Sequence, residues 1–430
     1  MTQHATAELS DATRQFLAEG HERATDVIRR NITASGFTAC SIEDNRFHGT
    51  EQNYRAVWAR DGALTVLWTL HISDPDIRTA QLRTLETLFE QQARNGQIPA
   101  SVSIDTGKPE YEGVGGIASI DSVLWLMIAT YDFAEVTGDW TIIENHQPQI
   151  DKAMQWLEAH DSNNCGLLEI PEAGDWTDLF ARSYHVLYDE VLWQRCLACY
   201  SCILRHLGDE EQARRYDAFA ELVRDKILSG FWPTTDGDGE YGRHLSFTQA
   251  QYSLGDARYF VAQLSPFSFS WRCDVYANVL AYLTGMVDDE HALMSFRFLW
   301  GAGVNEPGPV KNLYPPVQTG DPEWRDYFAV NMLNLPDHYH NGGIWPFIGG
   351  MWVRYVHKLG MVDLAHHEMI KLARLCQNGL MDHWEFNEWH HGQTGRPMGK
   401  RYQAWSAASF IQACHDLSLT PETTPRFSRI

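Results

Sequence analysis

Apolar and charged helical runs alternate along the chain. Six runs are apolar on nearly every face: residues 62–70, 120–131, 186–204, 271–284, 344–356 and 402–414. Each has a more charged, amphipathic partner, near residues 76–94, 139–159, 209–228, 288–300, 361–377 and, at the N-terminus, 8–31. A helix that is apolar all round is buried, and an amphipathic helix covers one side of a core. The pattern therefore predicts six helical hairpins in two concentric layers.

The junctions inside these hairpins resemble one another. Four of them place glycine between the apolar run and its charged partner, at Gly138, Gly208, Gly285 and Gly360. Glycine is the preferred residue just past a helix C-terminus, and its return at intervals of roughly 75 residues indicates a repeated structural unit. We expect an all-α (α/α)6 barrel, with an open solenoid as the competing architecture. The predicted inner helices start near residues 61, 119, 185, 270, 342 and 401 of a single domain spanning residues 1–430.

Strand signals are weak by comparison. Residues 251–254 and 258–264 are the best candidates for a small hairpin. They lie in a connection between residues 229 and 269, and a second long connection spans residues 301–340. Loops of this length are usually functional, so we expect both to lie at one rim of the barrel.

Composition narrows the class of partner. The net charge of −22 disfavours nucleic acid and favours a small neutral substrate. No window approaches the ~18 apolar residues of a membrane span, and the N-terminus lacks a signal-peptide pattern, so we expect a cytoplasmic protein without a membrane partner. Cys196, Cys199 and Cys202 repeat every three residues and predict one helical face in a reducing compartment. The sequence leaves a homo-oligomer open.

Polar and tryptophan residues gather where the inner runs begin, which predicts one funnel-shaped cleft at a single rim. Asp61 and Asp121 could instead cap helices, and Trp125 is the apolar-run tryptophan that we expect to reach the cleft. No nucleotide-binding loop, serine-hydrolase elbow or metal-ligand spacing is present, so we expect neither a cofactor nor a metal. The segments at the rim are 58–61, 119–121, 175–178, 270–272, 338–345 and 400–403.

Two stretches set carboxylates beside tryptophan in turn-prone settings. They are Glu172-Ala-Gly-Asp175-Trp176-Thr-Asp178 and Glu385-Phe-Asn-Glu388-Trp389. Tryptophan stacks on a sugar ring, and a carboxylic acid protonates a glycosidic oxygen. The pattern indicates carbohydrate chemistry.

Several motifs resemble the alkaline and neutral invertases. These are His340-Asn-Gly-Gly-Ile-Trp345-Pro, Glu388-Trp-His-His, Gly395-Arg-Pro-Met-Gly-Lys400, Tyr402-Gln-Ala-Trp405, Trp58-Ala-Arg-Asp61 and Asp121-Ser-Val-Leu-Trp125. In addition, Trp176-Thr-Asp178 resembles the amylo-α-1,6-glucosidase domain of glycogen debranching enzymes, and residues 172–175 resemble the acidic loop of trehalases. The chain departs from the invertases after Asp178, where residues 179–185 replace a basic, glycine-containing stretch.

The resemblance implies an inverting glycoside hydrolase of the α-glucosidase or invertase type. Asp178 is the expected general acid and Glu388 the expected base, with Glu385 and Asp175 as the next candidates. The expected substrate is a short α-linked saccharide, sucrose-like or α-glucosidic. The alternatives are a sugar epimerase or isomerase on the same barrel, which histidines would serve, and a non-catalytic carbohydrate-binding protein. The expected substrate-binding residues are Trp58, Arg60, Asp61, Asp121, Trp125, Asp175, Trp176, Arg272, His340, Asn341, Trp345, Glu385, Lys400, Gln403 and Trp405.

Overall fold

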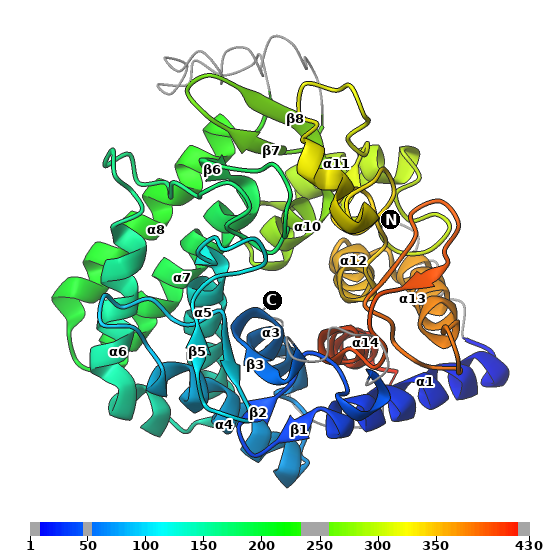
Figure 1. Cartoon of the computed structure of the whole chain (residues 1–430), viewed down its shortest axis with the longest axis horizontal. Coiled ribbons are helices and arrows are strands. Elements are labelled where there is room, and N and C mark those ends of the chain that lie inside the picture. Colours follow the sequence, from blue (N-terminus) through cyan, green and yellow to red (C-terminus); the bar gives the residue numbers. More distant parts are fainter. Residues whose placement is uncertain (1–8, 46–53, 234–257, 420–430) are drawn as a thin grey trace.

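The computed structural model describes residues 9–45, 54–233 and 258–419. Within these ranges, six inner helices surround the centre and six outer helices lie around them (Figure 1). The inner helices are α3 (Ala59–Thr69), α5 (Ile120–Thr137), α7 (Leu187–His206), α10 (Val275–Leu283), α12 (Pro346–Lys358) and α14 (Ala404–Asp416). The outer helices are α1 (Asp11–Arg30), α4 (Pro75–Glu90), α6 (Thr141–Glu158), α8 (Glu210–Gly230), α11 (Asp289–Gly301) and α13 (Val362–Gln377).

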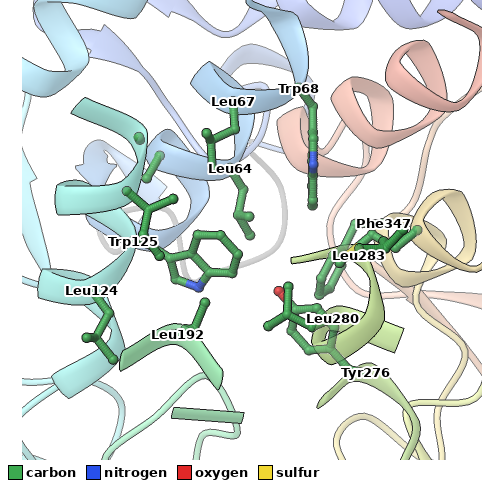
Figure 2. Close-up of a cluster of buried hydrophobic side chains, with 14 of the residues drawn as sticks. Leu64, Leu67, Trp68, Leu124, Trp125, Leu192, Tyr276, Leu280, Leu283 and Phe347 are labelled. Carbon is green, nitrogen blue, oxygen red and sulfur yellow. The ribbon is translucent and has the colours of Figure 1, made fainter. Parts of the chain in front are cut away.

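The inner helices form a closed ring. Each packs against the next along the chain, and α14 packs back against α3, so the competing open solenoid is wrong. Every residue of α3 is buried, as expected for a helix with apolar residues on all sides. Figure 2 shows side chains of α3, α5, α7, α10 and α12 meeting at the centre, with Trp68 and Trp125 among the largest fully buried groups.

Glycine closes each inner-to-outer junction that the sequence singled out. Gly138, Gly208, Gly285 and Gly360 all have left-handed backbone conformations, with φ between 71° and 86°. A Cβ atom at any of the four would meet nothing within 4 Å, so the backbone conformation and not crowding requires glycine there.

Short antiparallel strands lead into several inner helices. The largest sheet has the order β6 (His185–Val186), β7 (Val261–Leu264), β8 (Phe269–Asp274), β9 (Leu313–Tyr314). A second sheet joins β3 (Ala56–Trp58), β4 (Ser101–Ser103) and β5 (Pro109–Glu110), and two further pairs are β1 (Ile32–Thr33) with β2 (Gly36–Phe37) and β10 (Trp389–His390) with β11 (Pro397–Met398). Because β3, β6 and β8 run directly into α3, α7 and α10, these strands lie at the N-terminal rim of the ring.

The expected strand hairpin lies only partly within the described residues, and the start of the fourth inner helix differs from the one expected. Strand β7 pairs with β6 and β8, and residues 251–254, its expected partner, lie outside the described residues. The fourth inner helix starts at Val275, not near 270, because residues 269–274 form β8 and the Asp274 carboxylate caps the helix by accepting the Ala277 N–H at 2.9 Å. The long connection at 301–340 contains β9 and the 3-10 segment Asp326–Met332.

The cysteines Cys196, Cys199 and Cys202 share helix α7, and none of the eight cysteines forms a disulfide in the described structure. Within the described ranges, no helix combines the length and the apolar character that crossing a bilayer requires.

Candidate active site

A pocket opens where the inner helices begin. Its wall comes from the strand–helix junction before α3, the loop before α7, the loop before α12, and the loop before α14 with the first turn of that helix. The lining residues are Ala39, Tyr54, Trp58, Arg60, Asp61, Val114, Trp176, Asp178, Tyr339, His340, Trp345, Glu388 and Trp405. Three of the six segments expected at the rim contribute to this lining, namely 58–61, 175–178 and 338–345, whereas 119–121, 270–272 and 400–403 do not. Both candidate catalytic carboxyls, Asp178 and Glu388, lie in the pocket.

Asp178 lies on a braced loop, which we call the acid loop and define as residues 171–183. Its ends meet where Ile170 and Tyr184 pair as a β-bridge. Inside it, the Asp175 carboxylate accepts the Thr177 N–H at 2.7 Å and a hydrogen bond from Arg182 at 2.9 Å. Arg182 also forms an ion pair with Asp274, the cap of helix α10. These contacts fix the backbone on both sides of Asp178 and leave its carboxyl in the pocket.

The surroundings of Asp178 suit a proton donor. Burial raises its pKa from 3.8 to about 7, against the lowering effect of Arg60. Negative charges on Asp121, Asp175 and Asp61 contribute to this rise. A carboxyl with this pKa keeps a substantial protonated population near neutral pH, which a general acid needs.

Glu388 is held as a hydrogen-bond acceptor. Its Oε1 accepts the hydroxyl of Tyr54 at 3.2 Å, and its Oε2 accepts the backbone N–H of Lys400 at 3.0 Å. Burial raises its pKa, while the Lys400 N–H and the Tyr54 hydroxyl lower it. Gly399 makes this approach possible: its φ is +70°, and a Cβ there would lie 2.4 Å from Glu388 Oε2. The glycine of the Gly-Arg-x-x-Gly-Lys motif thus has a steric role.

Arg60 and Asp61 are adjacent in sequence but differ in partners. Arg60 donates to Asp121 at 2.5 and 2.8 Å, and Asp121 also accepts the hydroxyl of Tyr188 at 2.9 Å. Burial raises the pKa of Asp61 to about 7, although Arg60 lowers it. Asp121 therefore holds Arg60 in place, and Asp61 is a third carboxyl in the pocket.

The aromatic part of the pocket offers hydrogen-bond donors without protein partners. The ring of Trp176 packs edge-on against His340 at 4.7 Å, and His340 stacks on Trp345 at 5.2 Å. Both ring nitrogens of His340 and the Nε1 atoms of Trp176 and Trp405 lack hydrogen-bond partners among the described residues. Burial lowers the pKa of His340 well below its usual value, and the charges of Arg182 and Arg60 lower it further. A neutral imidazole and free indole N–H groups suit sugar hydroxyls.

Several predicted binding residues lie outside this lining. The Trp125 indole is fully buried and donates to the Tyr188 hydroxyl at 2.6 Å, so it belongs to the core. Arg272 pairs with Asp321 and Glu323. The others placed behind or beside the lining are Asp121, Asp175, Asn341, Glu385, Lys400 and Gln403.

Glu385, the alternative base, stabilises a turn of the backbone. Its buried carboxylate accepts backbone N–H groups from Leu380, Met381 and Asp382 at 2.6–3.0 Å. Arg401 lies 3.3 Å from it. With its oxygens occupied in this way, Glu385 holds the loop that carries Glu388.

Four lining residues were not selected from the sequence: Ala39, Tyr54, Val114 and Tyr339. Tyr339 lies between His338 and His340, and these two histidines carry the stronger chemical signal in the sequence. Tyr54 precedes Trp58 by four residues, and only the fold shows that it reaches Glu388, 334 positions later. Val114 and Ala39 carry no chemical signal in sequence.

Comparisons with known proteins agree with this fold. Residues 49–295, more than half of the chain, match the family model for the bacterial alpha-L-rhamnosidase 6 hairpin glycosidase domain, and residues 248–421 match that for alkaline and neutral invertase. Cytosolic invertase 1 of Oryza sativa subsp. japonica is 24% identical over 416 residues, covering 85% of this chain and 72% of the relative. Alkaline/neutral invertase E, chloroplastic, of Arabidopsis thaliana is 28% identical, covering 91% and 71%.

Solved structures confirm the (α/α)6 barrel. A mannosylglycerate hydrolase from Thermus thermophilus, in complex with Tris and D-glycerate, superposes with a TM-score of 0.62 at 14% identity, covering 91% of this chain and 99% of its own. A bacterial glucoamylase complexed with acarbose gives 0.59 at 14% identity, covering 94% and 56%. The fold and the family match together define the class of protein, a six-hairpin glycosidase. The chain belongs to the bacterial alpha-L-rhamnosidase six-hairpin glycosidase domain family and is a glycoside hydrolase, and its resemblance to the alkaline and neutral invertases is confirmed.

Proposed function

We propose that this glycoside hydrolase cleaves a short, neutral α-linked saccharide with inversion, using Asp178 as the general acid and Glu388 as the general base. The observation that carries the proposal is the contrast between the two carboxyls of one pocket. Burial and neighbouring negative charges keep Asp178 protonated up to about pH 7. Burial raises the pKa of Glu388 as well, but Glu388 accepts two hydrogen bonds that favour its ionised form.

The two carboxyls have separate tasks in such a reaction. Asp178 would donate its proton to the glycosidic oxygen as the bond to the leaving group breaks. Glu388 would take a proton from a water molecule that attacks the anomeric carbon from the opposite face. Asp61, His340 and the unpartnered indole N–H groups would bind sugar hydroxyls.

Charge and pocket shape support the substrate class. The net charge of −22 disfavours a polyanionic substrate, and the aromatic walls formed by Trp176, Trp345 and Trp405 suit one sugar ring. We propose that residues 1–430 form one catalytic domain. We expect it to act in the cytoplasm and to have no nucleic-acid partner. The families that match are glycosidases, which favours hydrolysis over the epimerase and binding-protein alternatives.

A substrate screen with two variants tests the proposal. Sucrose, trehalose, isomaltose, kojibiose, glucosylglycerate, mannosylglycerate and an α-L-rhamnoside would be read by released monosaccharide. On the substrate that is cleaved, Asp178→Asn and Glu388→Gln should each lower kcat by a factor of roughly 10²–10⁴ or more. With a fluoride or aryl glycoside, which needs little protonation, Asp178→Asn should regain part of its rate and Glu388→Gln should not. Near-normal turnover by either variant would contradict the assignment.

A further inference from the structure

A thiol, an imidazole and a carboxylate lie next to one another outside the active-site pocket. Cys165 Sγ is 3.8 Å from Nε2 of His185, and His185 Nδ1 is 3.6 Å from Oε1 of Glu190. Cys165 is partly exposed, whereas Glu190 is fully buried. Glu190 Oε1 has no hydrogen-bond partner among the described residues. In this cluster the partly exposed thiol of Cys165 lies beside the His185 imidazole, and the buried Glu190 carboxylate lies on the other side of the ring. The thiol is the nucleophile and the imidazole is the base.

The hydrogen bonds of His185 determine which nitrogen faces the thiol. Nδ1 lies 3.0 Å from the backbone carbonyl oxygen of Leu168, which can only accept, so Nδ1 carries a hydrogen. Nε2 is then the nitrogen that can take the Cys165 proton. Burial would lower the pKa of His185, but contacts with Cys165 and Glu190 raise it to about 10. At neutral pH the imidazole therefore holds the proton that it shares with the thiol.

The loop that carries Cys165 is pre-organised. The Asp161 carboxylate accepts the Cys165 N–H at 2.8 Å and the Gly166 N–H at 2.7 Å. Glu190 Oε2 accepts the Leu168 N–H at 3.2 Å. These hydrogen bonds fix the backbone of residues 165–168, which keeps the Cys165 sulfur beside the His185 imidazole.

This cluster adjoins the base of the acid loop. His185 directly follows Tyr184, whose bridge to Ile170 closes that loop, and Leu168 lies two residues before Ile170. A group added to Cys165 would press on His185 and Leu168 together. The displacement would be passed to the two ends of the segment that holds Asp178.

We propose that Cys165 is a modification site, a thiol activated by His185 and Glu190 that reacts with peroxide and with soft electrophiles, and that its modification slows glycoside hydrolysis. With the proton of the pair held on His185, the Cys165 sulfur attacks one oxygen of hydrogen peroxide. The O–O bond breaks, and the leaving hydroxide takes the proton back from His185 to form water. Sulfur is oxidised by two electrons to sulfenic acid, and peroxide is reduced.

Thiol reactivity is measured first, without reference to glycosidase activity. Cys202 is the other partly exposed cysteine, so Cys202→Ala provides the background. Iodoacetamide alkylation of Cys165 at pH 7, followed by peptide mass spectrometry, should be about tenfold slower in His185→Gln and several-fold slower in Glu190→Gln. Continued protection of the buried Cys196 and Cys273 shows that the variants stay folded. Alkylation no faster than that of N-acetylcysteine, and indifferent to both substitutions, would overturn the proposal.

The link to the acid loop rests on the proposed function and has its own readout. Hydrogen peroxide should give a dimedone-trappable adduct at Cys165 and lower kcat at least twofold, with recovery after thiol reductant. Cys165→Ser should keep its activity under the same treatment. A full adduct with unchanged kcat would overturn the link. If no glycoside is cleaved at all, the alkylation rates still decide whether the thiol is activated.

Discussion

Asn334 Nδ2 donates a hydrogen bond to the backbone carbonyl oxygen of Asp178 at 3.2 Å. The same amide nitrogen lies 3.0 Å from the carbonyl oxygen of Leu179, and Asn334 Oδ1 accepts the N–H of His340 at 3.1 Å. One fully buried side chain therefore ties the candidate acid to the loop that carries a candidate sugar-binding histidine. Phe180 stacks on Phe328 at 4.6 Å beside it, so the two loops are packed together as well as hydrogen-bonded.

Asn334→Ala should lower kcat more than it raises KM. Losing these bonds frees Asp178 from its position while most of the sugar-binding wall remains, at a cost of about 1–3 kcal/mol in stability. Steady-state kinetics and thermal unfolding give both quantities. Asn305→Ala is the matched control, because Asn305 is also buried but bonds Glu368, outside the pocket. It should lower the melting temperature similarly and leave kcat unchanged. Equal loss of kcat in both variants would show that Asn334 acts through stability alone.

The pH profile of kcat/KM should be bell-shaped. The alkaline limb belongs to Asp178, which must be protonated, so activity should fall as pH rises through about 7. The acid limb belongs to Glu388, which must be ionised.

A substitution identifies the alkaline limb. Asp61 is one of the charges that raise the pKa of Asp178, so Asp61→Asn should move that limb to lower pH. An alkaline limb that stays in place in this variant would mean that another group controls it.

Tyr54→Phe should impair the base. Without the 3.2 Å hydrogen bond, Glu388 loses an interaction that lowers its pKa, so the acid limb should move to higher pH and kcat should fall about tenfold. Tyr111→Phe is the control, since that hydroxyl donates to the Gln91 carbonyl, outside the pocket. The role given to Tyr54 fails if its variant has the same acid limb as the unmodified enzyme.

The spacing of apolar residues predicted most of the helical architecture, because a helix buried on all sides is apolar at nearly every position. The prediction was wrong where a strand with alternating apolar residues runs directly into a helix. Phe269, Trp271 and Cys273 alternate with polar residues, which is a strand pattern, but the apolar run that follows hides it, and the helix was predicted to begin too early. Helix α12 starts at Pro346 and not near residue 342 as predicted, and proline favours the first turn of a helix.

The site was predictable to the level of segments but not of single side chains. Glu385 and Glu388 have similar neighbours in sequence. Their difference depends on the backbone N–H groups of residues 380–382, which fold onto Glu385, and on Gly399, which lets the backbone reach Glu388. Trp125 stands on a helix buried on every face, so no pattern tells whether it faces the pocket or the core.

The anomer released first tests the central claim most directly. Inversion requires Glu388 to activate water on the face opposite to the bond that Asp178 protonates. With an α-glucoside or whichever α-linked substrate the screen identifies, ¹H NMR spectra recorded within the first turnovers, before mutarotation, should show the β-anomer of the released sugar accumulating first. Initial release of the α-anomer would mean retention of configuration and would contradict the assignment of Asp178 and Glu388 as an inverting acid and base.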